Sequence, residues 1–289
     1  MNHNYNHIGL NPDSEENLPV FIQNLEIPYK KTREEVWAAL DARLTAKPTP
    51  EIQFFSSYKL TFGIAAAFLL LAGIFSLLRF YTTTVYCPSG QHLSYILPDK
   101  SSVEMNADSR MAFKPLWWWY SRKLNFEGEG FFEVEKGKKF EVVSNVGRTE
   151  VLGTSFNIYS RDNEYEVNCI TGKVKVTSFT LDEVVLSPEY QAKVDSEGNI
   201  EVWKESKAGL SHSWVSNMFN FTARPLEQVL NEIGRQYNVT VTSKAGLEYS
   251  YTGYFSKVRS VEEVLTLVCK PFGLTFVRIS EKEYEIFQN

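Results

Sequence analysis

One stretch of the sequence restricts the possible folds of this chain more than any other. Residues 60–78 read LTFGIAAAFLLLAGIFSLL, nineteen residues without a charge, and Lys59 and Arg79 lie at the two ends. A helix rises about 1.5 Å per residue, so this run covers roughly the 30 Å hydrocarbon core of a bilayer. The run therefore predicts one transmembrane helix over residues 59–80. A buried helix of a soluble core is the alternative.

The charges beside this run predict its orientation. Arg43, Lys47 and Lys59 lie within about twenty residues on the N-terminal side, whereas only Arg79 lies that close on the other side. Cytoplasmic flanks carry the excess of Lys and Arg, so we expect a cytoplasmic N-terminus. Residues 1–58 would then form a short cytoplasmic segment, with residues 81–289 beyond the membrane. This layout is typical of signalling across a bilayer.

The cytoplasmic segment contains one clear helix signal, TREEVWAALDARL, at residues 32–44. Thr32 and Glu35 have the spacing of a capping box, in which each side chain accepts a hydrogen bond from the other residue's backbone N–H. Apolar residues then recur along one helix face: Val36, Trp37, Leu40 and Leu44. A segment this short buries little core, so the exposed stripe predicts a protein partner. The alternative is a helix that lies on the membrane surface or packs against itself.

Residues 81–203 show the pattern of an all-β domain. Apolar and polar residues alternate, and turn residues recur every eight to twelve positions. Eight short segments read as strands: 92–97, 102–106, 130–136, 139–144, 156–160, 165–170, 173–178 and 184–187. We therefore predict a sandwich, a barrel or a solenoid-like domain.

Composition and residue placement argue against several classes of function. The formal net charge is −5, which does not favour a basic nucleic-acid-binding protein. The four histidines and three cysteines are dispersed: His3, His7, His92, His212, Cys87, Cys169 and Cys269. Their spacing matches neither a metal site, a CxxC pair nor a Ser-His-Asp relay. We expect no cofactor, no metal, no direct nucleic-acid binding and no catalytic turnover.

Two patterns keep other functions open. The run Trp117-Trp118-Trp119-Tyr120 could stack on a sugar, which would suit a membrane-tethered carbohydrate-binding protein, although some of these rings should enter the core. The glutamates at i, i+2 spacing could mimic the carboxylate pair of a glycosidase, although a solvated strand face explains them more simply. These glutamates form two pairs: Glu127 with Glu129, and Glu133 with Glu135.

A Gly-Thr dipeptide, Gly153-Thr154, lies in the segment EVLGTSFNIY. A threonine hydroxyl can attack the preceding carbonyl carbon when the backbone is bent, and glycine at that carbonyl lowers the steric barrier. The pair is thus a candidate self-cleavage junction. The alternative is that the glycine serves only a bend between strands.

The C-terminal region contains an internal repeat. Residues 223–243 align with residues 258–278 at an offset of 35 positions, and each copy predicts a strand, a helix and a strand. The two helices should bury matching apolar residues: Leu226, Val229, Leu230 and Ile233, and Val261, Val264, Leu265 and Val268. We predict a small duplicated βαβ domain over residues 204–289, with residues 284–287 (YEIF) as a final edge strand. Such a domain is suited to binding or to capping the β-rich region.

The motifs of residues 97–194 resemble those of a known family. They read LPDKSSVEMNADS, FEGEGFFEVEKGKKFEV, VLGTSFNIY, ITGKVKV and VVLSPEYQAKV. These motifs are similar to the periplasmic domain of the FecR-type anti-sigma factors. Residues 214–287 resemble the additional C-terminal domain of the Bacteroidetes members, which is itself similar to the short secretin and TonB N-terminal module. With the span and the short N-terminal segment, the resemblance covers nearly the whole chain.

Three positions depart from the family pattern. Lys100 stands where the family usually has Gly after Leu-Pro-Asp, and Gly130 replaces a common Ala. Glu189-Tyr190 replaces a Pro-Gly-polar turn. We expect these departures to alter turns and not the fold.

The resemblance implies a role and a set of partners. The outer domains would contact the periplasmic signalling domain of a TonB-dependent outer-membrane receptor. The N-terminal segment would bind a cytoplasmic extracytoplasmic-function sigma factor. Stepwise proteolysis in or near the inner membrane, by periplasmic and intramembrane proteases, would then release or activate that sigma factor and control nutrient-uptake genes. Some relatives cut themselves at a Gly-Thr bond by an N-to-O acyl shift, and Gly153-Thr154 occupies that position.

Overall fold

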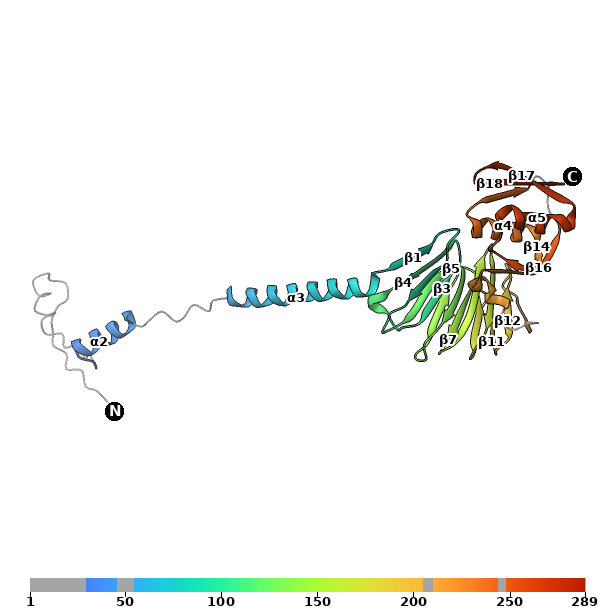
Figure 1. Ribbon diagram of the computed structural model, residues 1–289. Coiled ribbons are helices and arrows are strands. Elements are labelled where there is room, and N and C mark those ends of the chain that lie inside the picture. Colours follow the sequence, from blue (N-terminus) through green and yellow to red (C-terminus); the bar gives the residue numbers. More distant parts are fainter. Residues whose placement is uncertain (1–29, 46–54, 205–209, 244–247, 289) are drawn as a thin grey trace, which may run out of the picture. The chain divides into compact units, whose positions relative to one another are not determined.

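The computed structural model describes residues 30–45, 55–204, 210–243 and 248–288 (Figure 1). The chain divides into two compact units, Met1–Ala66 and Ala67–Asn289. Of the expected cytoplasmic segment, residues 1–29 and 46–54 lie outside the described residues, and so do Lys47, His3 and His7. Each unit is described by itself.

Helix α2 (Arg33–Leu44) begins where the capping box predicts. The Thr32 hydroxyl accepts a hydrogen bond from the Glu35 backbone N–H at 3.3 Å. The Glu35 carboxylate in return accepts one from the Thr32 backbone N–H at 3.0 Å. Two backbone donors at the helix start are thereby satisfied, which fixes the first turn. No residue of α2 is buried.

Helix α3 (Phe55–Phe80) contains the apolar run. Its part Tyr58–Phe80 is 23 residues long, has a mean hydropathy of 2.3 and has none of its side chains buried in the protein. A helix of that length and composition can cross a bilayer. An exposed apolar helix does not fit the alternative of a buried core helix, so the chain has a candidate membrane span.

The region after α3 is mostly β. It consists of β1 (Thr83–Cys87), β2 (Leu93–Ile96), β3 (Ser102–Met105), β4 (Ser109–Phe113), β5 (Arg122–Glu133), β6 (Phe140–Val143), β7 (Gly147–Val151), β8 (Ser155–Arg161), β9 (Glu164–Cys169), β10 (Val174–Ser178), β11 (Glu183–Leu186), β12 (Tyr190–Val194) and β13 (Ile200–Lys204). All eight predicted strands are present. Alternation explains why, since β5 buries every second side chain along most of its length.

Strand β5 belongs to two halves of one nearly closed sheet. One half has the order β1-β4-β5-β6-β7-β10-β11, and the other has the order β2-β3-β5-β8-β9-β12-β13. The first part of β5 pairs with β4 and β6, and the second part pairs with β3 and β8. The change occurs at Gly128, where φ is +114° and a Cβ would lie 2.6 Å from the Ser109 Cα. Only glycine fits there, and the two halves enclose one apolar core.

Two of the family departures lie where the backbone is left-handed. Lys100 and Glu189 both have φ of +70°. Glycine adopts that conformation without a steric penalty, whereas a residue with a Cβ does not. Both residues occupy tight turns, and the fold is retained, as expected.

The C-terminal region forms a second, smaller domain with its own core. It consists of η3 (Leu210–Ser216), β14 (Met218–Pro225), α4 (Leu226–Tyr237), β15 (Thr240–Ser243), β16 (Ser250–Ser256), α5 (Val261–Cys269), η4 (Lys270–Phe272), β17 (Leu274–Ser280) and β18 (Glu283–Gln288). Each copy of the repeat has the predicted strand, helix and strand. Seven of the eight predicted helix residues are buried, and Val261 is half-buried.

The strand pairing in this domain differs from that of a simple duplicated βαβ unit. The predicted duplicated βαβ unit is therefore not confirmed. The first strands of the two copies, β14 and β16, pair with each other. The second strands lie in a separate sheet of order β15-β18-β17. The prediction that residues 284–287 form an edge strand is wrong, because β18 lies between β15 and β17. Tyr284 and Ile286 of β18 are buried in the core, and a central position satisfies the backbone of such a strand on both sides.

Candidate functional site

Helix α2 presents an uncovered apolar face. Trp37 is 60% exposed, Leu44 is 77% exposed, and Leu40 is exposed too, whereas Val36 is half-buried. Their spacing places all four side chains on one side of the helix. Burial of large apolar side chains against a partner lowers the free energy, because it removes them from water. An exposed stripe of this kind is what a partner's hydrophobic groove would cover.

The Gly153-Thr154 junction lies between β7 and β8. Gly153 has φ of +150°, and a Cβ there would lie 2.7 Å from the Lys136 Cα. The glycine is therefore required for the bend, whatever else it does. Thr154 is buried, and within the described part of the chain its hydroxyl has no hydrogen-bond partner. Its carbonyl accepts the Val134 N–H at 2.9 Å, so the backbone after the junction is fixed.

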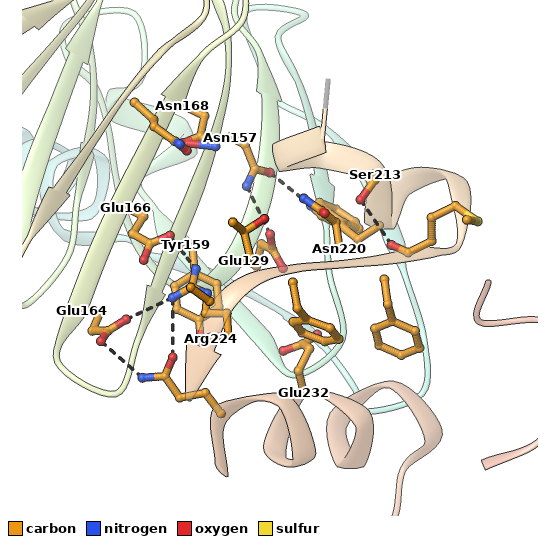
Figure 2. Close-up of a pocket in the computed structure, with 18 of the residues that line it drawn as sticks. Glu129, Asn157, Tyr159, Glu164, Glu166, Asn168, Ser213, Asn220, Arg224 and Glu232 are labelled. Carbon is orange, nitrogen blue, oxygen red and sulfur yellow. Dashed lines mark hydrogen bonds and ion pairs between the residues drawn. The ribbon is translucent and has the colours of Figure 1, made fainter. Parts of the chain in front are cut away.

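Sequence reasoning did not find the cavity between the β domain and the C-terminal domain. It has a volume of about 520 Å³ and is lined by β8, β9 and β12 on one side and by β14 and α4 on the other. Figure 2 shows Asn157, Tyr159 and Glu164 from the sheet, with Arg224 and Glu232 opposite. These residues are up to 75 positions apart in the sequence, so no local pattern indicates the cavity.

Arg224 of β14 connects the two domains. Its guanidinium lies 3.2 Å from a Glu164 oxygen and 2.5 Å from a Glu166 oxygen, both on β9. The same group lies over the Tyr159 ring at 5.1 Å from the centroid. Burial opposes the charge of Arg224, but the two carboxylates outweigh it and raise the pKa of Arg224. Lys193 adds a further ion pair to Glu164 at 2.9 Å.

Two carboxylates from different domains lie close together at the inner side of this cavity. Glu129 accepts hydrogen bonds from the side-chain amides of Asn106 at 2.7 Å and Asn157 at 3.2 Å. Burial, followed by the charge of Glu232, raises the pKa of Glu129 to about 7. Burial also opposes ionisation of Glu232, but nearby arginines, Arg161 foremost, lower the pKa of Glu232 overall. At neutral pH the site therefore holds one ionised carboxylate and one that is partly protonated.

The connecting segment η3 adds hydrogen bonds and ring contacts between the domains. The Trp214 indole donates to the Asn157 side-chain oxygen at 3.1 Å. His92 packs edge-on against Trp214 at 5.3 Å, and its Nε2 lies 3.1 Å from the Gln236 side-chain oxygen. His212 stacks on Phe131 at 4.9 Å. Both histidines are thus structural in this contact.

The glutamate pairs do not form a glycosidase site. Glu127 and Glu129 lie on the same face of β5, but they line different cavities on either side of Gly128. Glu133 and Glu135 are exposed, and Glu133 accepts a hydrogen bond from Ser102 at 3.2 Å. Among the described residues, no group of His, Cys, Asp or Glu side chains is arranged to hold a metal.

The aromatic run divides between core and surface. Trp118 is buried and contacts Phe113 and Phe140 edge-on. Trp117 is half-buried, whereas Trp119 and Tyr120 are exposed. The prediction that some of these rings enter the core holds for Trp118.

Comparisons with known proteins agree with this architecture. Residues 83–175 match the family described as FecR protein, and residues 218–286 match the family described as FecR, C-terminal. Together the two matches cover more than half of the chain. A comparison with curated proteins found no match.

Solved structures give the same result. Two crystal structures, at 2.50 Å and 1.65 Å resolution, are each of a candidate anti-sigma factor from Parabacteroides distasonis. Each is 26% identical to this chain and covers 72% of it. The matches include 100% and 99% of those chains, with TM-scores of 0.67 and 0.66. The families and structures that match are those of regulatory anti-sigma factors, and such a factor implies a sigma factor as its partner. The chain belongs to the FecR-type anti-sigma factors.

Proposed function

We propose that this chain is a single-pass regulator of the inner membrane that relays a signal from a TonB-dependent outer-membrane receptor to a cytoplasmic extracytoplasmic-function sigma factor. The genes controlled would serve uptake of a nutrient such as a glycan or iron. The observation that carries the proposal is the uncovered apolar face of α2, on the N-terminal side of a candidate span, in a member of an anti-sigma family.

We assign a separate function to each consecutive segment of the chain. Residues 1–58 are the cytoplasmic sigma-binding segment, and residues 59–80 are the transmembrane helix. Residues 81–203 form the FecR-like domain and residues 204–289 the C-terminal domain, both in the periplasm. The excess of Lys and Arg before the span supports this orientation. Periplasmic and intramembrane proteases would act between the outer signal and the release or activation of the sigma factor.

The sigma factor would bind Val36, Trp37, Leu40 and Leu44 of α2. Exposure of Trp37, Leu40 and Leu44 supports the assignment. The test is capture of the tagged full chain, solubilised from membranes of the source organism, with bound proteins identified by mass spectrometry. Recovery of one sigma factor is expected. Its absence, with the chain intact, would contradict the proposal.

We further propose self-cleavage at Gly153-Thr154. The Thr154 Oγ would attack the Gly153 carbonyl carbon, the C–N bond would break, and the ester formed would be hydrolysed to a Gly153 carboxylate and a free Thr154 amine. Among the described residues the buried Thr154 hydroxyl has no hydrogen-bond partner, which supports this step.

Fragment analysis of membranes tests the cleavage step. The parent and Thr154→Ser should give two fragments, because both retain a hydroxyl, while Thr154→Ala should stay full length. Full-length parent protein alone would leave the glycine with its role in the bend only.

A membrane-tethered carbohydrate-binding protein is the second candidate function. The exposed rings of Trp119 and Tyr120 are the feature that favours it. Binding of the detergent-solubilised full chain to a glycan array, lost with Trp119→Ala, would support this candidate. A blank array would remove it.

A further inference from the structure

We propose that residues 114–120, the connection between β4 and β5, dock on the headgroup interface of the same lipid bilayer that α3 crosses. The occupant of this surface is the phospholipid interface itself. This inference rests on the proposed span, and its test separates the two. The surface consists of Lys114, Leu116, Trp117, Trp119 and Tyr120, together with Arg79 and Phe80 at the end of α3.

Contact with the span sets the depth of this surface. The Trp117 ring lies edge-on against Phe75 of α3, with 5.7 Å between ring centroids. Phe75 precedes the last residue of α3, Phe80, by five positions. Five residues correspond to about 7.5 Å along a helix axis. If α3 spans the bilayer, Trp117 therefore lies at the boundary between hydrocarbon and headgroups.

The charges at this boundary complement phospholipid headgroups. The Arg79 guanidinium lies over the Trp117 ring at 5.5 Å from its centroid. The Lys114 ammonium lies over the Phe80 ring at 5.6 Å. Residues 109–126 contain no Asp or Glu. Positive charges beside aromatic rings are typical of the membrane interface, where the cations face lipid phosphates.

The remaining rings are free to enter the interface. Trp119 is 77% exposed and Tyr120 is 78% exposed, and Leu116 beside them is exposed as well. Tyr120 packs against Trp117 at 4.9 Å between ring centroids, so the surface continues from the span to these residues. Trp and Tyr favour this zone because the ring is apolar and its N–H or O–H group is polar.

The fold holds this surface in place. Trp118 is fixed in the core of the β domain, so the neighbouring side chains point outward. The backbone N–H of Tyr120 donates to the Trp117 carbonyl at 3.0 Å, which closes the turn. A rigid connection of this kind would tether the FecR-like domain to the bilayer at a second point beside α3, and would restrict the positions from which a receptor domain could approach.

Site-directed spin labelling of the full chain tests the proposal. The chain would be reconstituted in vesicles of phosphatidylcholine and phosphatidylglycerol, with one label at a time through Trp119→Cys, Leu69→Cys or Leu181→Cys. Leu69 lies within α3, and Leu181 lies in the turn before β11 at the far edge of the same sheet half. Leu69 and Leu181 are each 75% exposed. The three native cysteines are buried, and the unsubstituted chain shows how much label they take up.

Accessibility to oxygen, which concentrates in lipid, is compared with accessibility to a polar nickel complex. We expect the label at position 69 to be deepest, the label at 181 to be in water, and the label at 119 to shift from the aqueous value toward that of 69. An aqueous value at 119, with 69 in lipid, would overturn the docking and leave the span intact. A label at 119 shielded from both reagents would indicate a second copy or another protein and would also overturn it. An aqueous value at 69 would contradict the span itself.

Discussion

The two outer domains bury most of their apolar residues in separate cores, whereas they meet through charged and polar side chains together with the rings of Trp214 and His212. The β domain encloses Phe132, Phe156 and their neighbours, and the C-terminal domain has its own cluster around α4 and α5. Between them lie Arg224, Glu129 and Glu232 around a cavity. The cores make each domain stable, whereas the polar contact depends on a few charges. Polar contacts between domains favour relative motion, which suits a protein that senses a partner.

The largest expected effect is in the core of the β domain. Phe132→Ala removes a ring that stacks on Phe156 at 5.1 Å and leaves a cavity. We expect a loss of about 3–5 kcal/mol in the free energy of unfolding. Chemical denaturation of the full chain in detergent measures it. The control Leu181→Ala, at an exposed position, should change stability by no more than about 0.5 kcal/mol. Equal effects would contradict the assignment of Phe132 to the core.

A smaller effect is expected at the polar contact. Arg224→Ala removes one cation from Glu164 and Glu166, which keep their ion pairs to Lys193. Loss of hydrogen bonds to charged groups costs about 1–3 kcal/mol. We therefore expect Arg224→Ala to weaken the contact between the two domains and to leave their cores unchanged. Hydrogen exchange should then increase at β9, β14 and α4.

The matched control for Arg224 is Arg278→Ala. Arg278 is exposed and lies 3.8 Å from Glu262 within the C-terminal domain. This variant should leave exchange at the contact unchanged. Increased exchange throughout both domains in Arg224→Ala would contradict a separable contact.

The polar contact should also depend on pH, unlike the cores. The pKa of Glu129 rises from its ordinary 4.5 to about 7 in the folded protein. Between these values the folded state keeps a proton that the unfolded state has lost, so stability falls as pH rises, and the dependence ends above pH 7.

Glu129→Gln removes this titration. The measurement is the thermal unfolding midpoint of the parent and of this variant at each pH. Burial lowers the pKa of His92 in both proteins, so the difference between the two midpoints cancels the contribution of His92. We expect the parent to lose stability relative to Glu129→Gln from pH 5 to pH 8, two values that bracket most of the transition. A constant difference would show that Glu129 does not titrate in this range.

The smallest expected effect concerns a turn of the β domain. Lys100 has a left-handed conformation, which costs a residue with a Cβ about 1–2 kcal/mol, and Lys100→Gly relieves this strain. Glycine loses more backbone entropy on folding, which costs about 0.5–1 kcal/mol. We expect a net gain of about 0.5 kcal/mol by denaturation. Lys173→Gly, at an exposed position without positive φ, should be destabilising instead. A loss of stability in Lys100→Gly would contradict the strain argument.

Local patterns predicted the elements of this fold well. Alternation indicated eight strands, and the Thr32 and Glu35 pair indicated the start of α2. The patterns failed where polar residues are buried by distant partners. Strand β7 (GRTEV) looks polar, but Thr149 is buried against Tyr165, to whose hydroxyl it is hydrogen-bonded at 2.7 Å. Strand pairing in the C-terminal domain was missed because each repeat alone does not specify which sheet its strands join.

The candidate sites also differ in how far local sequence patterns predict them. The apolar face of α2 could be predicted because it depends only on helical spacing. The cavity between the domains could not, because it requires β9 and β14 to meet, and their charged residues resemble ordinary solvated strand faces. Glu129 was identified as one of a pair, but its environment depends on Asn106, Asn157 and Glu232 from three other segments.

The central claim is that α2 binds the sigma factor through its apolar face. The most direct measurement is the affinity of the detergent-solubilised full chain for the captured sigma factor, with Trp37→Asp compared with Ala38→Asp. Ala38 lies on the opposite side of the same helix, so both variants carry the same new charge in α2. The account predicts that Trp37→Asp abolishes binding and that Ala38→Asp retains it. Equal affinities for the two variants would contradict the claim.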